Sequence, residues 1–95
     1  MLSIATFRLA AGTDAEAFVA SDARYQCDVA YQQPGLLRRT TAHADDGGWL
    51  VVTLWSSADH EANACEAGRA DAAALAHRTL IDRSTLQRGS FTTLD

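Results

Sequence analysis

The sequence predicts an α+β fold in which four antiparallel strands form one sheet and helices cover one of its faces. The main observation is the stretch from Gln33 to Trp55, where two strand-like segments flank a turn signal. Pro34-Gly35 ends a preceding helix, because proline lacks an N–H group and disfavours helical geometry in the residue before it. Asp45-Asp46-Gly47-Gly48 fits a hairpin turn, since glycine tolerates the positive φ that such turns need. The second observation is that helix-like patterns precede and follow this hairpin.

The N-terminal part reads as a strand followed by a long helix. Leu2 to Leu9 is strand-like, with apolar side chains at both odd-numbered and even-numbered positions and so on both faces of the strand. Thr13 looks like an N-cap, and Glu16 completes a capping box three residues later, so we expect a helix from residue 14 to about residue 32. Its apolar residues recur near the 3.6-residue period. Asp22 falls on the axis of this apolar stripe, where leucine would be expected.

The rest of the chain predicts the hairpin, two helices and a last strand. Ser56 or Ser57 is expected to cap the first of these helices, and Gly68 to end it. The order β-α-β-β-α-α-β joins strands 1 and 2, and strands 3 and 4, through helical crossovers, which is the ferredoxin-like arrangement. The expected segments are strands at residues 36–44, 49–55 and 85–94, and helices from the Ser56 or Ser57 cap to about residue 67 and from residue 70 or 71 to 81.

The segment from Trp49 to Trp55 also predicts quaternary structure. Thr53 is its only polar residue, so the segment lacks polar alternation and reads as a strand buried on both faces. A chain of 95 residues can cover one face of the sheet with its own helices and has little left for the other. We therefore expect a homodimer in which a second copy covers the open face.

Composition excludes several classes of function. The net charge is −4, which argues against nucleic-acid binding. All eight cations are arginine, so a Schiff-base or P-loop lysine is excluded. The chain has no apolar run of membrane length and no signal-peptide pattern. Cys27 and Cys65 are far apart and read as reduced thiols. We expect a single cytoplasmic domain over residues 1–95, with no cofactor and no nucleic-acid or membrane partner.

Three short features resemble the antibiotic-biosynthesis-monooxygenase-like family. They are Pro34-Gly35 opening the second strand, Trp55 in the third strand, and Ser57 two residues later, starting the next helix. The resemblance covers nearly the whole chain in the order of its elements. It implies a dimeric α+β barrel, in which two sheets pack face to face and a ligand lies between the sheet and the helices of one subunit. The family includes cofactor-independent oxygenases of aromatic polyketides and haem-degrading enzymes.

The sequence departs from the family pattern in two places. Many members carry a histidine nine residues after the strand-three tryptophan, where this chain has Ala64. The haem-degrading branch also resembles this layout but has an asparagine on strand one, where this chain offers Ala5, and a later histidine, which His77 matches only in a shifted register. These departures argue against haem degradation by that mechanism.

Asp22 is the main candidate for chemistry. If it faces the sheet from the first helix, its carboxylate lies in a partly apolar cleft, and Arg38 or Arg39 on the second strand can supply a cation. One interpretation makes Asp22 a general base or an anchor for a substrate hydroxyl. The other, which we favour, makes it half of a structural Asp–Arg pair that ties the helix to the sheet.

Other polar and aromatic residues are candidates for a ligand site. Trp49 and Trp55 share one face of the third strand, where they form either the wall of a cavity or, as we favour, the core of a dimer interface. The three histidines lack metal-ligand spacing. His77 keeps a possible polar role at the cavity, although an ordinary packed histidine is favoured. The remaining substrate-binding candidates are Tyr25, Gln26 and Tyr31.

These features support one functional hypothesis and two rivals. The first is cofactor-independent oxygenation of a small electron-rich aromatic, with Asp22 as base, Arg38 or Arg39 stabilising the substrate anion, and Trp55, Tyr25 and Tyr31 as walls. The rivals are a non-catalytic or stress-related dimer that binds a small apolar or aromatic molecule, and an isomerase or cyclase on the same scaffold.

Overall fold

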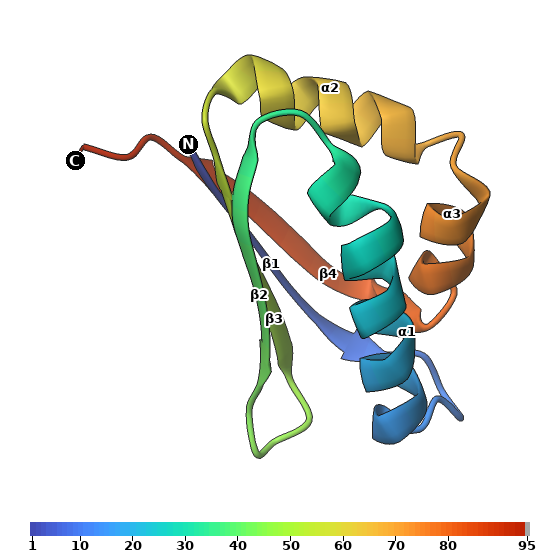
Figure 1. Cartoon of the computed structure of the whole chain (residues 1–95). Helices are drawn as coiled ribbons and strands as arrows, with labels where there is room; N and C mark the ends of the chain where they lie inside the picture. Colours follow the sequence, from blue (N-terminus) through green and yellow to red (C-terminus); the bar gives the residue numbers. More distant parts are fainter. Residues whose placement is uncertain (95) are drawn as a thin grey trace.

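The computed structural model describes residues 1–94 and contains one antiparallel sheet with the strand order β2-β3-β1-β4. All helices lie against one face of this sheet, and the opposite face is bare (Figure 1). The predicted order of elements and the ferredoxin-like arrangement are confirmed. The observed bounds are β1 Leu2–Leu9, α1 Ala15–Asp28, η1 Ala30–Gln32, β2 Leu36–His43, β3 Trp49–Trp55, α2 Ala58–Gly68, α3 Ala72–Arg78 and β4 Ile81–Phe91.

Helix α1 begins and ends differently from the prediction. Its N-cap is Asp14 and not Thr13, because the Asp14 carboxylate accepts a hydrogen bond from the backbone N–H of Glu16 at 3.2 Å. The helix stops at Asp28 because Val29 leaves helical geometry, with φ −122° and ψ −61°. The chain then tightens into the 3-10 turn η1 instead of continuing as one helix to residue 32.

The second crossover is also shorter than predicted. Ser57 caps α2 by accepting from the His60 N–H at 3.2 Å, as expected, and Asp71 caps α3. Helix α3 ends at Arg78 and does not reach residue 81, because Ile81 pairs with Leu9 as the first residue of β4. β4 therefore starts four residues earlier than the predicted strand and ends at Phe91.

Strand register divides the sheet into two different faces. On β3, Trp49, Val51, Thr53 and Trp55 point towards the helices, and the residues between them point away. The outward face is apolar at its centre and is not covered within residues 1–94 (Figure 1). Its apolar side chains are Leu2, Ile4, Leu50, Val52, Leu54 and Phe91.

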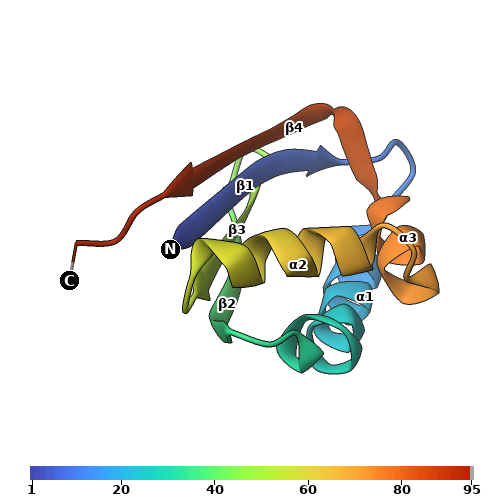
Figure 2. The same ribbon diagram turned by 90° about the horizontal axis from the view of Figure 1, so that it is seen from above.

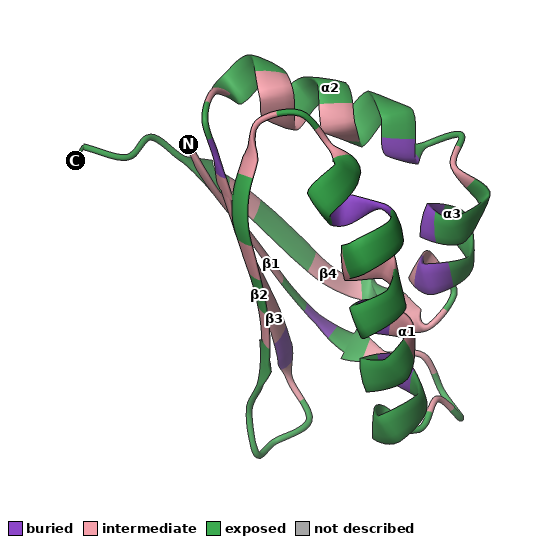
Figure 3. Ribbon diagram, in the orientation of Figure 1, coloured by how far each residue is buried: buried purple, intermediate pink, exposed green. Residues whose placement is uncertain are grey.

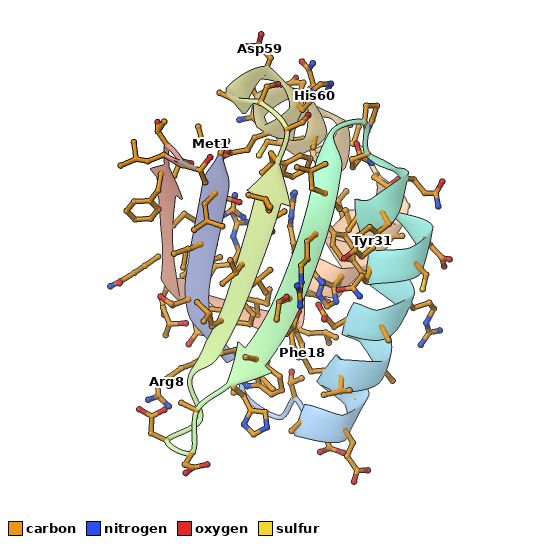
Figure 4. All side chains as sticks on the ribbon, turned by 60° about the vertical axis from the view of Figure 1, so that its left-hand side comes forward. Met1, Arg8, Phe18, Tyr31, Asp59 and His60 are labelled. Carbon is orange, nitrogen blue, oxygen red and sulfur yellow. The ribbon has the colours of Figure 1, made fainter. Side chains whose placement is uncertain are left out.

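The packed core lies at the hairpin end of the sheet. Phe18 of α1 is fully buried, and its ring meets those of Phe7 and Trp49 edge-on at centroid distances of 5.7 and 4.8 Å. Figure 4 shows Phe18 between α1 and the strands, with Arg8 near the hairpin tip, where Arg8 donates to the Asp46 carbonyl at 2.9 Å. Buried residues are concentrated between the helices and the sheet (Figure 3).

Helix α2 covers the other end of the sheet with few bulky side chains. Viewed from above, α2 crosses the same face that α1 and α3 cover, with β1 and β4 on the opposite side (Figure 2). Within residues 1–94, no helix is long and apolar enough to cross a lipid bilayer.

Candidate functional site

A cavity of about 520 Å³ lies between the sheet and the helices. Small side chains make the hollow. Register pairing places Ser3 and Thr53 side by side on the floor, with Ala5 and Val51 next to them. The roof from α2 includes the small residues Ala64, Cys65 and Gly68. The cavity is therefore a product of strand register and an alanine-rich helix.

Aromatic groups wall the two ends of this cavity. Phe7 marks the end next to the packed core, and Trp55 the end below the start of α2. Trp55 is buried, and its indole Nε1–H donates to the Ser3 hydroxyl at 3.3 Å. Both tryptophans face the helices: Trp49 packs on Phe18, and Trp55 lines the cavity. The expectation that they form the core of a dimer interface is therefore wrong.

A buried ion pair joins α1 to β2 beside the cavity. Arg39 NH2 donates to Asp22 Oδ1 at 2.8 Å and Arg39 NH1 donates to Oδ2 at 3.2 Å. Both side chains are under one-tenth exposed. The same guanidinium donates to the Gln26 amide oxygen at 3.2 Å and to the Thr41 hydroxyl at 3.3 Å, and its carbon lies 5.1 Å from the Tyr25 ring centroid.

His77 of α3 completes this cluster. Its Nε2 lies 3.2 Å from Asp22 Oδ1, and its Nδ1 lies 2.8 Å from the Ser21 hydroxyl. The ring is stacked between Phe18 and Tyr25, at centroid distances of 5.1 and 4.8 Å. An ionised carboxylate only accepts, so Nε2 carries a proton and, in the neutral ring, Nδ1 accepts from Ser21. Asp22 and Ser21 thereby fix the histidine tautomer.

The pKa of Asp22 lies well below its usual range. Burial alone would raise it, but the hydrogen bonds from His77, Arg39 and Thr41 and the charge of Arg39 stabilise the carboxylate and together lower it. A carboxylate with a lowered pKa and paired oxygens is a weak proton acceptor. Asp22 is also not among the residues that line the cavity, whereas Arg39, His77 and Tyr25 are. The geometry favours the structural pair over the general base.

The other predicted residues divide into those that join this cluster and those that do not. Arg39 faces the helices, whereas Arg38 is exposed and lies in register with Leu54 on the outward face. Gln26 holds Arg39 but does not line the cavity. Tyr31 lies on η1 beside β2 (Figure 4), where its hydroxyl accepts from the Arg39 backbone N–H at 2.8 Å and so satisfies the sheet edge instead of facing the cavity.

Among solved structures, the chain matches SnoaB, a cofactor-independent oxygenase from Streptomyces nogalater, with a TM-score of 0.73 and 26% identity over 99% of this chain and 92% of that one. A protein named as a candidate antibiotic biosynthesis monooxygenase from Nitrosomonas europaea matches with a TM-score of 0.75 and 14% identity, over 98% of this chain and 88% of that one. The resemblance to the antibiotic biosynthesis monooxygenase-like proteins is confirmed. Rv0793 from Mycobacterium tuberculosis has the same fold, with a TM-score of 0.69 and 16% identity over 99% of this chain and 94% of that one.

No protein-family model matches the sequence, and no match was found among curated proteins.

Within this monooxygenase-like fold, sequence reasoning missed two sets of polar residues. Ser21 and Thr41 belong to the Asp22 cluster. Only their positions in the sequence could have indicated this, since Ser21 adjoins Asp22 and Thr41 lies two residues after Arg39 on the same face of the strand. The second set consists of Arg78 on α3 and of Arg83 and Arg88 on β4, which line the cavity. Arg83 fell outside the predicted strand because the start of that strand was placed four residues too late. Among residues 1–94, no group of three or more histidine, cysteine or acidic side chains has metal-site geometry.

Proposed function

We propose that the protein is a cofactor-independent monooxygenase that acts on a small hydroxyarene of polyketide-like type. The main support for this proposal is the cavity of about 520 Å³, which has aromatic walls. The guanidinium of Arg39 is held in a fixed position at the side of this cavity. A volume of this size accommodates a flat molecule of two or three fused rings. The similarity to SnoaB, whose name states cofactor-independent oxygenation, supports the same class of reaction here.

The role of Arg39 in this proposal is to stabilise the substrate anion. A guanidinium next to a bound phenol favours the phenolate and lowers its pKa, so the proton can pass to water without a strong protein base. Asp22 is then a positioning residue, because it holds Arg39 through two hydrogen bonds and does not itself line the cavity. His77 and Tyr25 form the wall next to this cation.

The chemical step that we propose uses only the arene, water and O₂. The phenolate donates electrons to O₂, and a carbon–oxygen bond forms at the ring carbon para to the oxygen. The peroxide anion takes one proton from water, and the same ring carbon then loses its hydrogen as a proton while the O–O bond breaks. One oxygen remains as the new carbonyl and the other leaves as water. The arene loses four electrons and O₂ gains four, so a phenol and O₂ become a quinone and water.

Non-catalytic binding of a small aromatic is the second candidate, and one observation favours it. Both nitrogens of His77 are hydrogen-bonded within the cluster and both faces of its ring are covered, so neither nitrogen is free to give a proton to a ligand or take one from it. The isomerase or cyclase alternative depends on a carboxylate base, and the lowered pKa of Asp22 weighs against it.

Oxygen uptake separates these candidates. An oxygen electrode with 1-naphthol and 1,5-dihydroxynaphthalene is expected to show enzyme-dependent uptake, with one O₂ consumed per arene. Uptake at the enzyme-free rate with both arenes, while calorimetry still shows that they bind, would reject the oxygenase and leave the binding function.

The proposed active form is a homodimer, in which a second sheet covers the outward face defined above. Its centre is apolar, with Ile4, Val52 and Leu54 adjacent across β1 and β3. Sedimentation velocity is expected to give a dimer at micromolar concentration and a monomer for Val52→Glu. Val19→Glu, on the exposed side of α1, is the control that is expected to remain dimeric. A monomeric native chain would reject the dimer.

A further inference from the structure

Most of the cations of the chain line the cavity. The chain has a net charge of −4, yet five of its eight arginines line this one space, and among residues 1–94 Glu61 is the only acidic residue that does so. The lining therefore carries a net charge of +4, from five cations and one anion. These arginines are Arg39, Arg69, Arg78, Arg83 and Arg88.

Two of the five form ion pairs within the chain. Arg39 is paired with Asp22 at 2.8 Å, and Arg69 is paired with Glu66 at 3.1 Å. Glu61, the one acid of the lining, accepts a hydrogen bond from the Ser90 hydroxyl at 2.8 Å.

The other three, Arg78, Arg83 and Arg88, have no ion pair and no side-chain hydrogen bond among residues 1–94. Arg78 ends α3 and is half-buried, and its guanidinium reaches the buried Gly68 at the end of α2. Arg83 and Arg88 lie on β4 and are exposed, which places this side of the cavity next to solvent. None of these three cations has a counter-charge among residues 1–94, so each is free to bind an anion that enters the cavity.

Strand register places Arg88 opposite the Arg39 wall. Arg88 lies across the sheet from Thr41 in one row, through Ala5 and Val51, and the neighbouring row contains Arg39. β2 and β4 are the two edges of the sheet, three strand spacings or about 14 Å apart. Between these edges the floor carries only small or medium side chains, so a flat ring system fits with one end at each cation.

We propose that the cavity takes an aromatic ligand with two oxygen functions: a hydroxyl that lies against Arg39 and a carboxylate at the opposite end that binds Arg88 together with Arg78 or Arg83. This inference rests on the proposed function for the hydroxyl end and on the unpaired arginines for the carboxylate end. A carboxylate fits because each of its two oxygens accepts charge-assisted hydrogen bonds from a guanidinium. The preferred ligand is therefore an aromatic hydroxy acid, which the cavity binds more tightly than the neutral phenol.

The test is calorimetric binding of two probes that differ only in the acid group, 6-hydroxy-2-naphthoate and 2-naphthol. The native chain at low salt is expected to bind the acid at least about tenfold more tightly, the effect of a charge-assisted hydrogen bond. Arg88→Gln is expected to remove most of this preference while changing the affinity for 2-naphthol less than about twofold. Arg24→Gln, an equal charge change at an exposed position of α1 that does not line the cavity, is expected to preserve it.

Several outcomes would overturn the proposal. They are equal affinity for the two probes, a preference that survives in Arg88→Gln, a preference that Arg24→Gln also removes, or no binding of either probe. Oxygen uptake is measured separately, so the two ideas fail independently. A preference for the acid without any uptake keeps the hydroxy-acid ligand and rejects the oxygenase, whereas uptake with neutral naphthols and no preference does the reverse.

Discussion

Arg39 holds Asp22 through two parallel hydrogen bonds, from NH2 to Oδ1 at 2.8 Å and from NH1 to Oδ2 at 3.2 Å, with both side chains buried. This pair joins α1 to the edge strand β2, and His77 extends the connection to α3. Because the carboxylate is fully engaged and lies behind the cavity wall, its effect on a ligand is exerted through the position of Arg39.

Asp22→Asn is expected to destabilise the fold. The substitution leaves the Arg39 guanidinium buried without its counter-charge, and breaking a buried pair in this way costs about 3 kcal/mol. Urea unfolding measures this loss in the free energy of unfolding. Asp45→Asn, in the exposed hairpin, is the control and is expected to change it by less than about 0.5 kcal/mol. Equal effects of the two variants would contradict a stabilising role for the pair.

The stability that Asp22 provides is expected to depend on acid pH. Its pKa is lowered below the ordinary value of 3.8, so the folded chain binds this proton less readily than the unfolded chain. The contribution is therefore fully present above about pH 4 and is lost as the pH falls further, through the folded-state pKa. Unfolding free energies of the native chain and Asp22→Asn are expected to converge below pH 4. A constant difference between pH 7 and pH 3 would contradict the lowered pKa.

Ala64→Phe is expected to block the cavity. Ala64 lies on the cavity side of α2, so an aromatic ring at this position occupies the space of the ligand. Calorimetry is expected to show at least about a tenfold loss of affinity for 2-naphthol, while the free energy of unfolding changes by less than about 1.5 kcal/mol because an existing void is filled. Ala62→Phe, on the exposed side of the same helix, is expected to bind normally. Unchanged binding in Ala64→Phe would show that the ligand lies elsewhere.

Gly35→Ala is expected to cost more than Gly12→Ala. Both glycines have a positive φ, of +83° and +81°, which is strained for alanine. A methyl group at Gly12 meets open space, whereas at Gly35 it overlaps the His60 side chain. Thermal and urea unfolding are expected to show a loss of about 1 kcal/mol for Gly12→Ala and at least about 2 kcal/mol for Gly35→Ala. Equal losses would mean that the His60 contact gives way easily.

The sequence predicted the features that depend on local chemistry. Pro34-Gly35, the hairpin glycines and the Ser57 cap act through backbone geometry within a few residues, and each lies where it was expected. The short helix α3 was extended too far because Leu80 and Ile81 continue a helical pattern. Pairing of Ile81 with Leu9 is a contact between residues 72 positions apart, which no local pattern contains.

The candidate site was predicted only in part, for the same reason. An Asp22–arginine pair was expected, but the choice between Arg38 and Arg39 depends on which parity of β2 faces the helices. A register shift between Leu36 and Arg38 alters that parity locally and has no sequence signal. The face of Trp55 was equally undetermined, since both faces of β3 are apolar. The cavity could not be predicted from the sequence, because it forms where small residues of different strands meet.

Isotope labelling of the product tests the proposed oxygenation most directly. The purified protein is incubated with 1-naphthol under ¹⁸O₂, and the product is analysed by mass spectrometry. We expect 1,4-naphthoquinone with one labelled oxygen, formed at a rate that depends on the protein and falls strongly in Ala64→Phe. Quinone without label, or labelled quinone formed at the rate of the protein-free solution, would contradict the proposed oxygenation.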